Sequence, residues 1–119
     1  MQISNKGWQI ISGINGFMAL IMGAVAAHGL SDAQGVALAN KASFYQIIHA
    51  VILMVISEKE GKLWNRARWS LLLGLILFCG SIYARALFGW EEATSLAPIG
   101  GVCLMLGWAL IAASAYKTK

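Results

Sequence analysis

The chain has 119 residues, of which 59% are hydrophobic and 12% charged, and its mean hydropathy is +0.69. Soluble domains typically contain about 45–50% apolar and about 25% charged residues, so this composition indicates a protein embedded in lipid. The length allows one domain. A net charge of +4 would suit a nucleic-acid partner. We expect none, because the basic residues lie scattered at the ends of apolar runs and form no stripe with exposed aromatic residues.

Four apolar runs are each long enough to cross the roughly 30 Å hydrocarbon core of a bilayer as a helix. The predicted membrane spans cover approximately residues 8–27, 38–57, 69–88 and 98–116. A signal peptide is the alternative for the first run, since Ala24-Val25-Ala26 is similar to a cleavage site. Asn15 and the three further apolar runs favour a span. The predicted fold is an all-α, integral membrane four-helix bundle that includes residues 1–119.

Local signals indicate where the predicted helices begin and end. Gly29 follows the first run and suits the left-handed position that closes a helix. Ser31-Asp32-Ala33-Gln34 matches the S-x-x-Q capping box, which predicts a helix that starts at the membrane interface over residues 32–41. Pro98 suits the first turn of the fourth helix.

Small residues recur on single faces of three predicted helices. Helices in lipid associate by close packing, which small side chains permit. The residues are Gly16, Ala19, Gly23 and Ala27 in the first span, Ser70, Gly74, Ser81 and Ala84 in the third, and Gly100, Cys103 and Gly107 in the fourth. They predict a tight left-handed bundle with little room for a pore in one copy.

The distribution of Lys and Arg predicts the orientation. Four spans place both termini and the 58–68 loop on one side, which holds seven of the nine basic residues: Lys6, Lys59, Lys62, Arg66, Arg68, Lys117 and Lys119. The other side holds Lys41 and Arg85. The positive-inside rule therefore predicts cytoplasmic termini. The aromatic residues expected in a belt at the cytoplasmic interface are Trp8, Trp64, Trp69 and Tyr116, with Trp90 at the opposite interface.

The second run carries Tyr45, Gln46 and His49 on one helical face. These polar groups must face other helices, because unpaired donors in hydrocarbon cost several kcal/mol. Counting from the helix ends places Asn15, His49 and Trp108 near the membrane midplane. We therefore predict an intramembrane polar cluster of Asn15, Tyr45, Gln46 and His49, in which Asn15 and His49 approach each other directly or through water.

A second candidate cluster lies at the side opposite the termini. Its members are His28, Asp32, Arg85, Glu91 and Glu92. Arg85 lies about one turn inside the third span, and we expect its long side chain to extend outward to an acid.

His49 has two interpretations. It is either a neutral side chain that joins helices by hydrogen bonds or a proton-relay or ligand group within the membrane. A haem with two histidine ligands is excluded in one copy, since His28 lies about 16 Å from His49 in depth by helical rise. Cys79 and Cys103 are interpreted as small buried apolar residues, and their positions do not favour a disulfide. No nucleophile–base pair, metal-ligand spacing or phosphate loop is present in the sequence, so we expect no enzyme, no metal and no cofactor.

Four segments match the motifs of one known family in the same order. They are residues 23–30 (GAVAAHGL), 45–50 (YQIIHA), 78–83 (FCGSIY) and 97–101 (APIGG), the last followed by LGW at 106–108. The corresponding family motifs are GAFGAHGL, YQMYHAL, FSGSLY and TPIGG…LGW. The chain therefore resembles the small bacterial membrane proteins called YgdD-like or YwdK-like, domain of unknown function family 423. Arg85 stands where that family usually has an apolar residue. The resemblance implies a four-span inner-membrane protein whose activity is not established.

The expected function follows from these features. We expect a small multi-pass protein of the bacterial inner membrane, in contact with the lipid bilayer, with a structural, accessory or partner-binding role. It would act as a homo-oligomer or within a larger membrane complex. The alternative is a proton or small-solute pathway through an oligomer, centred on Tyr45, Gln46 and His49.

Overall fold

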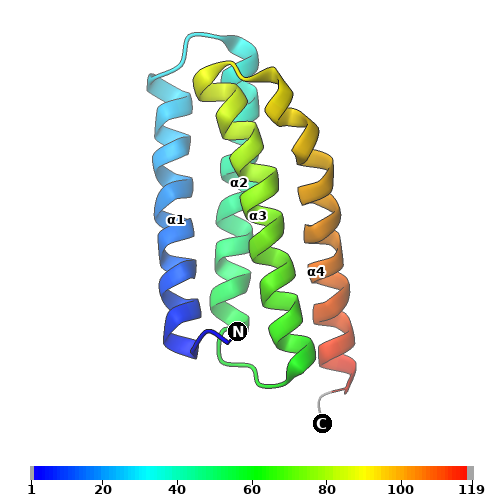
Figure 1. Cartoon of the computed structure of the whole chain (residues 1–119). Helices are drawn as coiled ribbons and strands as arrows, with labels where there is room; N and C mark the ends of the chain where they lie inside the picture. The colour runs from blue at the N-terminus through cyan, green and yellow to red at the C-terminus, as the bar shows by residue number, and fades with distance from the viewer. Residues whose placement is uncertain (1, 118–119) are drawn as a thin grey trace.

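The computed structural model describes residues 2–117 and consists of long helices packed side by side (Figure 1). The helices are α1 (Asn5–His28), α2 (Ala33–Ile56), α3 (Lys62–Phe88), the 3-10 helix η1 (Glu91–Leu96) and α4 (Ala97–Lys117). The described residues form no strand, so the all-α prediction is confirmed. Four helices are long and apolar enough to cross a membrane. Lys119, which contributes to the predicted orientation, lies outside the described residues.

The chain begins and ends at the same end of the bundle (Figure 1). We call this the terminal end. The opposite end, which we call the loop end, holds the α1–α2 connection and η1. Because each helix runs antiparallel to the one before it, the loop between α2 and α3 returns to the terminal end, where it lies beside the beginning of α1.

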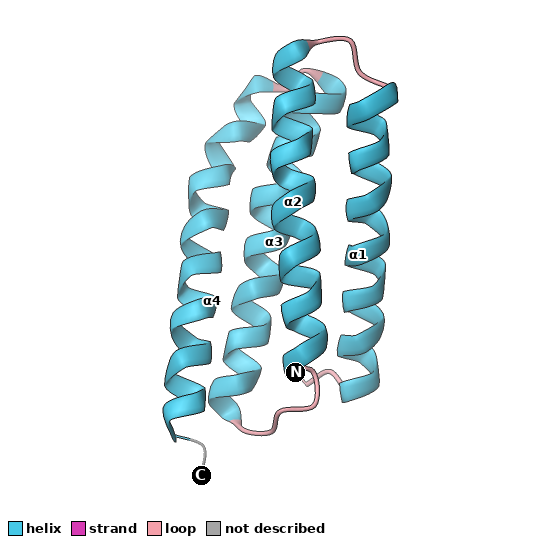
Figure 2. Ribbon diagram, turned by 180° about the vertical axis from the view of Figure 1, so that it is seen from behind, coloured by secondary structure: helices cyan, strands magenta, loops and turns pink. Residues whose placement is uncertain are grey.

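The helices pack around a central pair formed by α2 and α3. α1 packs on α2 and α4 packs on α3, and the views from front and back place α1 and α4 on opposite sides (Figures 1 and 2). In the described chain, no Cα atom of α4 comes within 8 Å of a Cα atom of α1 or α2. The bundle is therefore closely packed along three helix pairs, and side chains alone connect α4 to α2.

Small residues produce the closest of these interfaces, between α3 and α4. A Cβ atom at Gly107 would lie 2.5 Å from a side-chain methyl of Leu71, and one at Gly74 would lie 2.8 Å from the backbone nitrogen of Leu104. Gly100 packs directly on the backbone of Phe78. The predicted close packing of the fourth helix through glycine is confirmed, and a larger side chain at Gly100 or Gly107 would force α3 and α4 apart.

Two predictions about helix ends are wrong in detail. Asp32, one residue after Ser31, caps α2, and its carboxylate accepts a hydrogen bond of 3.0 Å from the Gly35 N–H. Asp and Ser are about equally good helix caps. At this position the Asp32 carboxylate also forms an ion pair with the Arg85 guanidinium, which a serine hydroxyl could not do. Gly29 ends α1 with φ of −108°, whereas the left-handed glycine is Gly89 at the end of α3, with φ of 68°. Pro98 lies in the first turn of α4, as predicted.

The tryptophans at the terminal end do not all form an interfacial belt. Trp8 is fully buried, and Trp64 is buried as well. The Trp8 ring meets the Trp69 ring edge to face, with centroids 5.4 Å apart, and the Arg68 guanidinium lies 5.7 Å from the Trp8 ring. The belt prediction is wrong for Trp8 and Trp64, because both side chains belong to the hydrophobic core of the bundle. Tyr116 is exposed at this end.

Candidate functional site

The Gln46 amide joins three helices inside the bundle. Its nitrogen donates a hydrogen bond of 3.1 Å to the Asn15 side-chain oxygen on α1, and its oxygen accepts one of 2.7 Å from the Tyr83 hydroxyl on α3. The Asn15 amide nitrogen donates to the Ile11 carbonyl, 2.9 Å away. Gln46 is buried. We call Asn15, Gln46 and Tyr83 the amide junction.

His49, one turn further along α2, forms a different connection. The Trp108 indole N–H on α4 donates a hydrogen bond of 3.0 Å to His49 Nε2, and His49 Nδ1 lies 2.6 Å from the Tyr45 carbonyl oxygen. An indole nitrogen only donates, so Nε2 accepts and the proton is on Nδ1, from which it is donated to the Tyr45 carbonyl. The imidazole is therefore neutral, and both its nitrogens are used.

The predicted cluster is divided between these two sites. No direct Asn15–His49 hydrogen bond forms within residues 2–117, because Asn15 pairs with Gln46 and His49 pairs with Trp108. Gln46 and His49 are three residues apart and point about 60° apart around the helix axis. That rotation turns Gln46 toward α1 and α3 and turns His49 toward α4.

The prediction that Tyr45 turns away from the surface is wrong. Its side chain is 40% exposed, and its hydroxyl forms no hydrogen bond with any described residue. The ring packs edge to face on Phe78, with centroids 5.2 Å apart. The phenol that bonds Gln46 comes instead from Tyr83, which is not among the predicted site residues. Its position in the FCGSIY segment, on the helix that follows, was the available signal.

A groove of 290 Å³ lies between α2 and α4, over α3. Tyr45 and His49 line it from α2, Phe78 from α3, and Met105 and Trp108 from α4. Met105, Trp108 and Tyr45 are exposed at its edges. The groove exists because α4 meets α2 only through side chains. We call it the aromatic groove.

At the loop end, Arg85 joins α3 to the start of α2 and to η1. The guanidinium lies 2.6 Å from a Glu91 carboxylate oxygen and 3.4 Å from one of Asp32, and it donates a hydrogen bond of 3.0 Å to the Gln34 amide oxygen. Arg85 is only 8% exposed. Its outward extension to acidic side chains is as the sequence predicts.

Two members of the predicted loop-end cluster, His28 and Glu92, do not take part in it. The side chains of His28 and Glu92 are exposed and form no hydrogen bond or ion pair within the described part of the chain. Asp32 does belong to the cluster. The hydrogen bond from the Gly35 N–H, together with the nearby Arg85 guanidinium, holds the pKa of the Asp32 carboxyl below its ordinary value.

The role of Arg68 was not predicted from the sequence, where this residue counts only among the cytoplasmic cations. Arg68 is 6% exposed, and its guanidinium donates hydrogen bonds of 2.8 and 2.9 Å to the carbonyls of Ile56 and Lys59. It thereby satisfies backbone groups where α2 ends. The available signal was spacing, since Arg68 falls on the same helical face as Trp64 and Leu71, both of which are buried.

The two cysteines are not joined by a disulfide. Cys79 is buried, and its thiol donates a hydrogen bond of 3.4 Å to the Ala42 carbonyl on α2. Cys103 is partly buried on α4. Within residues 2–117, no three side chains of His, Cys, Asp or Glu come together as a metal ion requires.

Comparison with known proteins identifies the family. A family model described as "Protein of unknown function (DUF423)" matches residues 22–101. The chain belongs to this family. It is 30% identical to a "UPF0382 membrane protein" of Haemophilus influenzae over 98% of both chains. It is 34% identical to a protein of the same name from Staphylococcus epidermidis, over 94% of this chain and 97% of the relative.

A third relative carries a more specific name. The "UPF0382 inner membrane protein YgdD" of Escherichia coli K12 is 32% identical, over 92% of this chain and 89% of its own length. No solved structure matches the chain. The predicted family is confirmed, and with it a multi-pass helical membrane protein whose family has no established activity.

Proposed function

We propose that this chain is a non-catalytic accessory protein of the bacterial inner membrane that binds a partner within the bilayer, either another copy of itself or another membrane protein. The observation that carries the proposal is the use of the buried polar groups of α2. Gln46 and both nitrogens of His49 are engaged in hydrogen bonds that hold the helices together. His49 therefore has no free ring nitrogen with which to relay a proton, and Gln46 is held in place through both ends of its amide.

The outer surface supports a partner-binding role. The aromatic groove lies at the depth of the Trp108–His49 hydrogen bond and has a hydroxyl of Tyr45 at its edge that lacks a partner among the described residues. A tyrosine in lipid gains free energy when its hydroxyl meets an acceptor on a neighbouring helix. A polar side chain on a helix of the partner would supply that acceptor.

The orientation forms part of the proposal. The terminal end carries Lys6, Lys59, Lys62, Arg66, Arg68 and Lys117, whereas the loop end and its approaches carry Lys41 and Arg85. The positive-inside rule supports a cytoplasmic terminal end. Labelling of Lys62→Cys and Glu92→Cys variants with a membrane-impermeant thiol reagent on intact cells tests this. We expect labelling of the second variant only.

Crosslinking tests the partner-binding role. A photoreactive amino acid at Met105 lies in the aromatic groove, and the same amino acid at Leu20, an equally exposed position on α1, is the matched control. In native membranes we expect a crosslinked band of defined mass from position 105 and much less from position 20. A band of twice the monomer mass identifies a second copy. Equal, diffuse labelling at both positions would contradict a docking site in the groove.

The proton or small-solute pathway remains the alternative expectation. It requires His49 to exchange protons, and each exchange would break the bond to Trp108 or the bond to the Tyr45 carbonyl. No acidic residue lies within the four long helices to share a proton with it, because the five acids of the chain are in η1 or in the connections. The geometry therefore favours the accessory role.

A further inference from the structure

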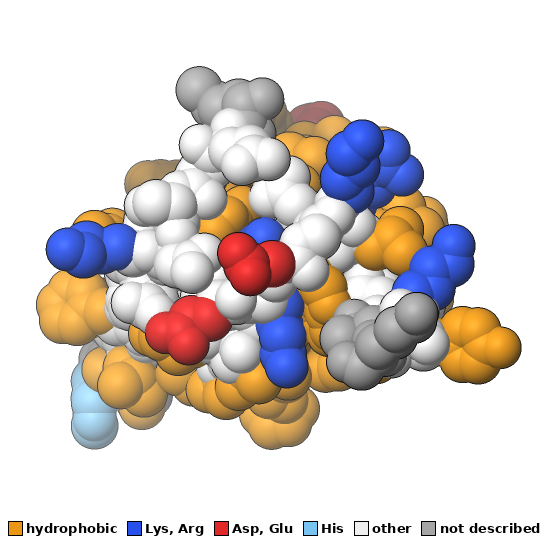
Figure 3. All heavy atoms as spheres, turned by 90° about the horizontal axis from the view of Figure 1, so that it is seen from below, with side chains coloured by type: hydrophobic (Ala, Val, Ile, Leu, Met, Phe, Trp, Pro, Cys, Tyr) orange, Lys and Arg blue, Asp and Glu red, His pale blue; other side chains and the backbone are white. Residues whose placement is uncertain are grey.

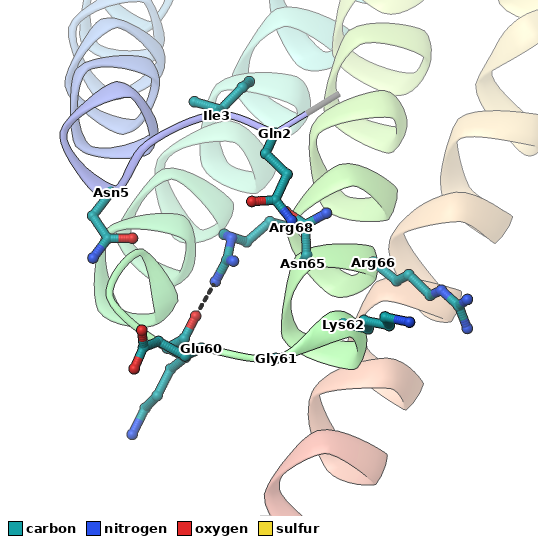
Figure 4. Close-up of a pocket in the computed structure, with 10 residues that line it drawn as sticks. Gln2, Ile3, Asn5, Glu60, Gly61, Lys62, Asn65, Arg66 and Arg68 are labelled. Atoms are coloured by element: carbon teal, nitrogen blue, oxygen red, sulfur yellow. Dashed lines mark hydrogen bonds between the residues drawn. The ribbon is translucent and has the colours of Figure 1, made fainter.

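A polar cavity of 390 Å³ opens at the terminal end, between the segment before α1, the α2–α3 connection and the first turns of α3. Figure 4 shows the Arg68 side chain extending from α3 toward the connection, with Gln2 and Asn65 close to it. The amides of Gln2, Asn5 and Asn65 line the cavity together with basic side chains. This site is far from the aromatic groove and does not depend on the partner-binding role.

The cavity is rich in uncompensated positive charge. Lys59, Lys62, Arg66 and Arg68 line it, and Glu60 is its one acidic side chain. The ion pairs within the described residues all involve Arg85 at the loop end, so none of these four cations has a carboxylate of a described residue within 4.0 Å. Figure 3 shows the basic side chains spread around this end of the molecule, with acidic ones between them.

Some hydrogen-bond donors beside this cavity have no acceptor among the described residues. Gly61 precedes α3 with φ of 124°, and no described side chain caps the first turn that follows it. The backbone N–H groups of Lys62 and Leu63 begin this turn, and together with the positive end of the helix dipole they favour an anion. Independently, Nε of the buried Arg68 has no hydrogen-bond partner among the described residues. A buried donor of this kind is costly unless an acceptor arrives.

We propose that this cavity binds a phosphate group, supplied by an anionic phospholipid head group or by a soluble phosphate. A phosphate offers several acceptor oxygens and negative charge, which match the donors of Arg68, the open N-terminus of α3 and the flexible cations Lys62 and Arg66. Basic pockets between membrane helices bind anionic head groups for the same reason. The amides of Gln2 and Asn65 would complete the polar wall around it.

Binding is measured as the shift in the unfolding temperature of the purified full chain in neutral detergent. The added probes are phosphatidylglycerol, phosphatidylcholine and inorganic phosphate, the last against chloride at equal ionic strength. The test variant is Lys62→Gln/Arg66→Gln, in which both side chains are exposed and line the cavity. The matched control is Lys6→Gln/Lys117→Gln, which removes the same charge from the same end outside the cavity.

We expect phosphatidylglycerol to stabilise the wild-type chain more than phosphatidylcholine does. The apparent affinity should fall about tenfold in Lys62→Gln/Arg66→Gln and less than about twofold in the control. If inorganic phosphate reproduces the effect and phosphatidylglycerol does not, the source is a soluble phosphate. Two results would overturn the site: no preference for either probe by the wild-type chain, or equal losses in both double variants, which would mean that only the overall charge matters.

Discussion

Gln46 and His49 lie one turn apart on the same helix, yet they do different structural work. Gln46 sits where α1, α2 and α3 meet, and its amide is bonded on both sides. His49 holds α4 across a gap that the backbones of α2 and α4 do not close, with the aromatic groove beside it. The comparison teaches that burial alone does not define a functional residue in lipid. The role of a buried polar side chain depends on how many helices it joins and on whether a groove lies beside it.

The largest expected effect comes from breaking the amide junction. Gln46→Leu leaves the Asn15 oxygen and the Tyr83 hydroxyl without their partner inside the bundle. A buried polar group without a partner costs about 1–3 kcal/mol, and Asn15 and Tyr83 are only partly buried, so we take the lower part of that range for each and expect the free energy of unfolding in detergent to fall by roughly 2–3 kcal/mol. Denaturant titration followed by circular dichroism measures this. A loss below that of the Trp108 variant described next would reverse the ranking of the two positions.

A smaller effect is expected at the His49 connection. Trp108→Phe keeps an aromatic ring in the aromatic groove and removes the N–H that bonds His49 Nε2. Hydrogen bonds between membrane helices average about 0.6 kcal/mol and reach about 1.7 kcal/mol, so we expect a loss of about 1 kcal/mol in the same titration. Trp90→Phe, at an exposed site outside the groove, is the control and should leave the stability unchanged.

A double-mutant cycle tests whether the two sites are separate. Asn15→Leu and Gln46→Leu should couple by about 0.6 kcal/mol or more, because their side chains share a hydrogen bond. Asn15→Leu and His49→Leu should be additive, since the two side chains have other partners. Coupling in the second pair as large as in the first would show that Asn15 and His49 act together after all.

The loop end offers the smallest effect, because the partners of Arg85 are exposed to water. The pKa of Asp32 is lowered from its ordinary value of about 3.9 by the Gly35 N–H and by Arg85. A lowered carboxyl pKa stabilises the fold above the ordinary value, and this contribution is lost as the pH falls through the lowered pKa. We therefore expect the unfolding temperature to drop slightly below about pH 4. Asp32→Asn keeps a side-chain oxygen as helix cap and should weaken that dependence of the unfolding temperature on pH. If the dependence is the same in the variant as in the wild-type chain, it arises from other acidic residues.

Much of the fold follows from the sequence because lipid imposes simple rules. Each long apolar run becomes one helix, since a backbone in hydrocarbon must bond within its own segment. α3 and α4 pack closely because Gly100 and Gly107 have no side chain. The face of α4 that carries these glycines is therefore buried by direct contact with α3. The inward direction of Gln46 and His49 follows from the cost of leaving them in lipid.

The pairing of the polar groups does not follow, because helical phase gives a direction and not a neighbour. Depth placed Asn15 and His49 at one level, but the arrangement of α1 and α4 on opposite sides separates their partners. The role of Arg68 could not be predicted for a similar reason. A cation near a helix end satisfies the positive-inside rule whether its side chain faces water or bonds backbone carbonyls. Its two carbonyl bonds depend on how the α2–α3 connection folds back.

Proton flux in proteoliposomes tests most directly whether the buried polar groups of α2 join helices or conduct. Vesicles that contain the purified chain and a pH-sensitive dye are subjected to a pH step and a membrane potential, and wild-type protein is compared with His49→Phe. We predict that both give the rate of protein-free vesicles, since His49 is bonded at both nitrogens. A rate above that background in the wild-type chain that disappears in His49→Phe would contradict the account.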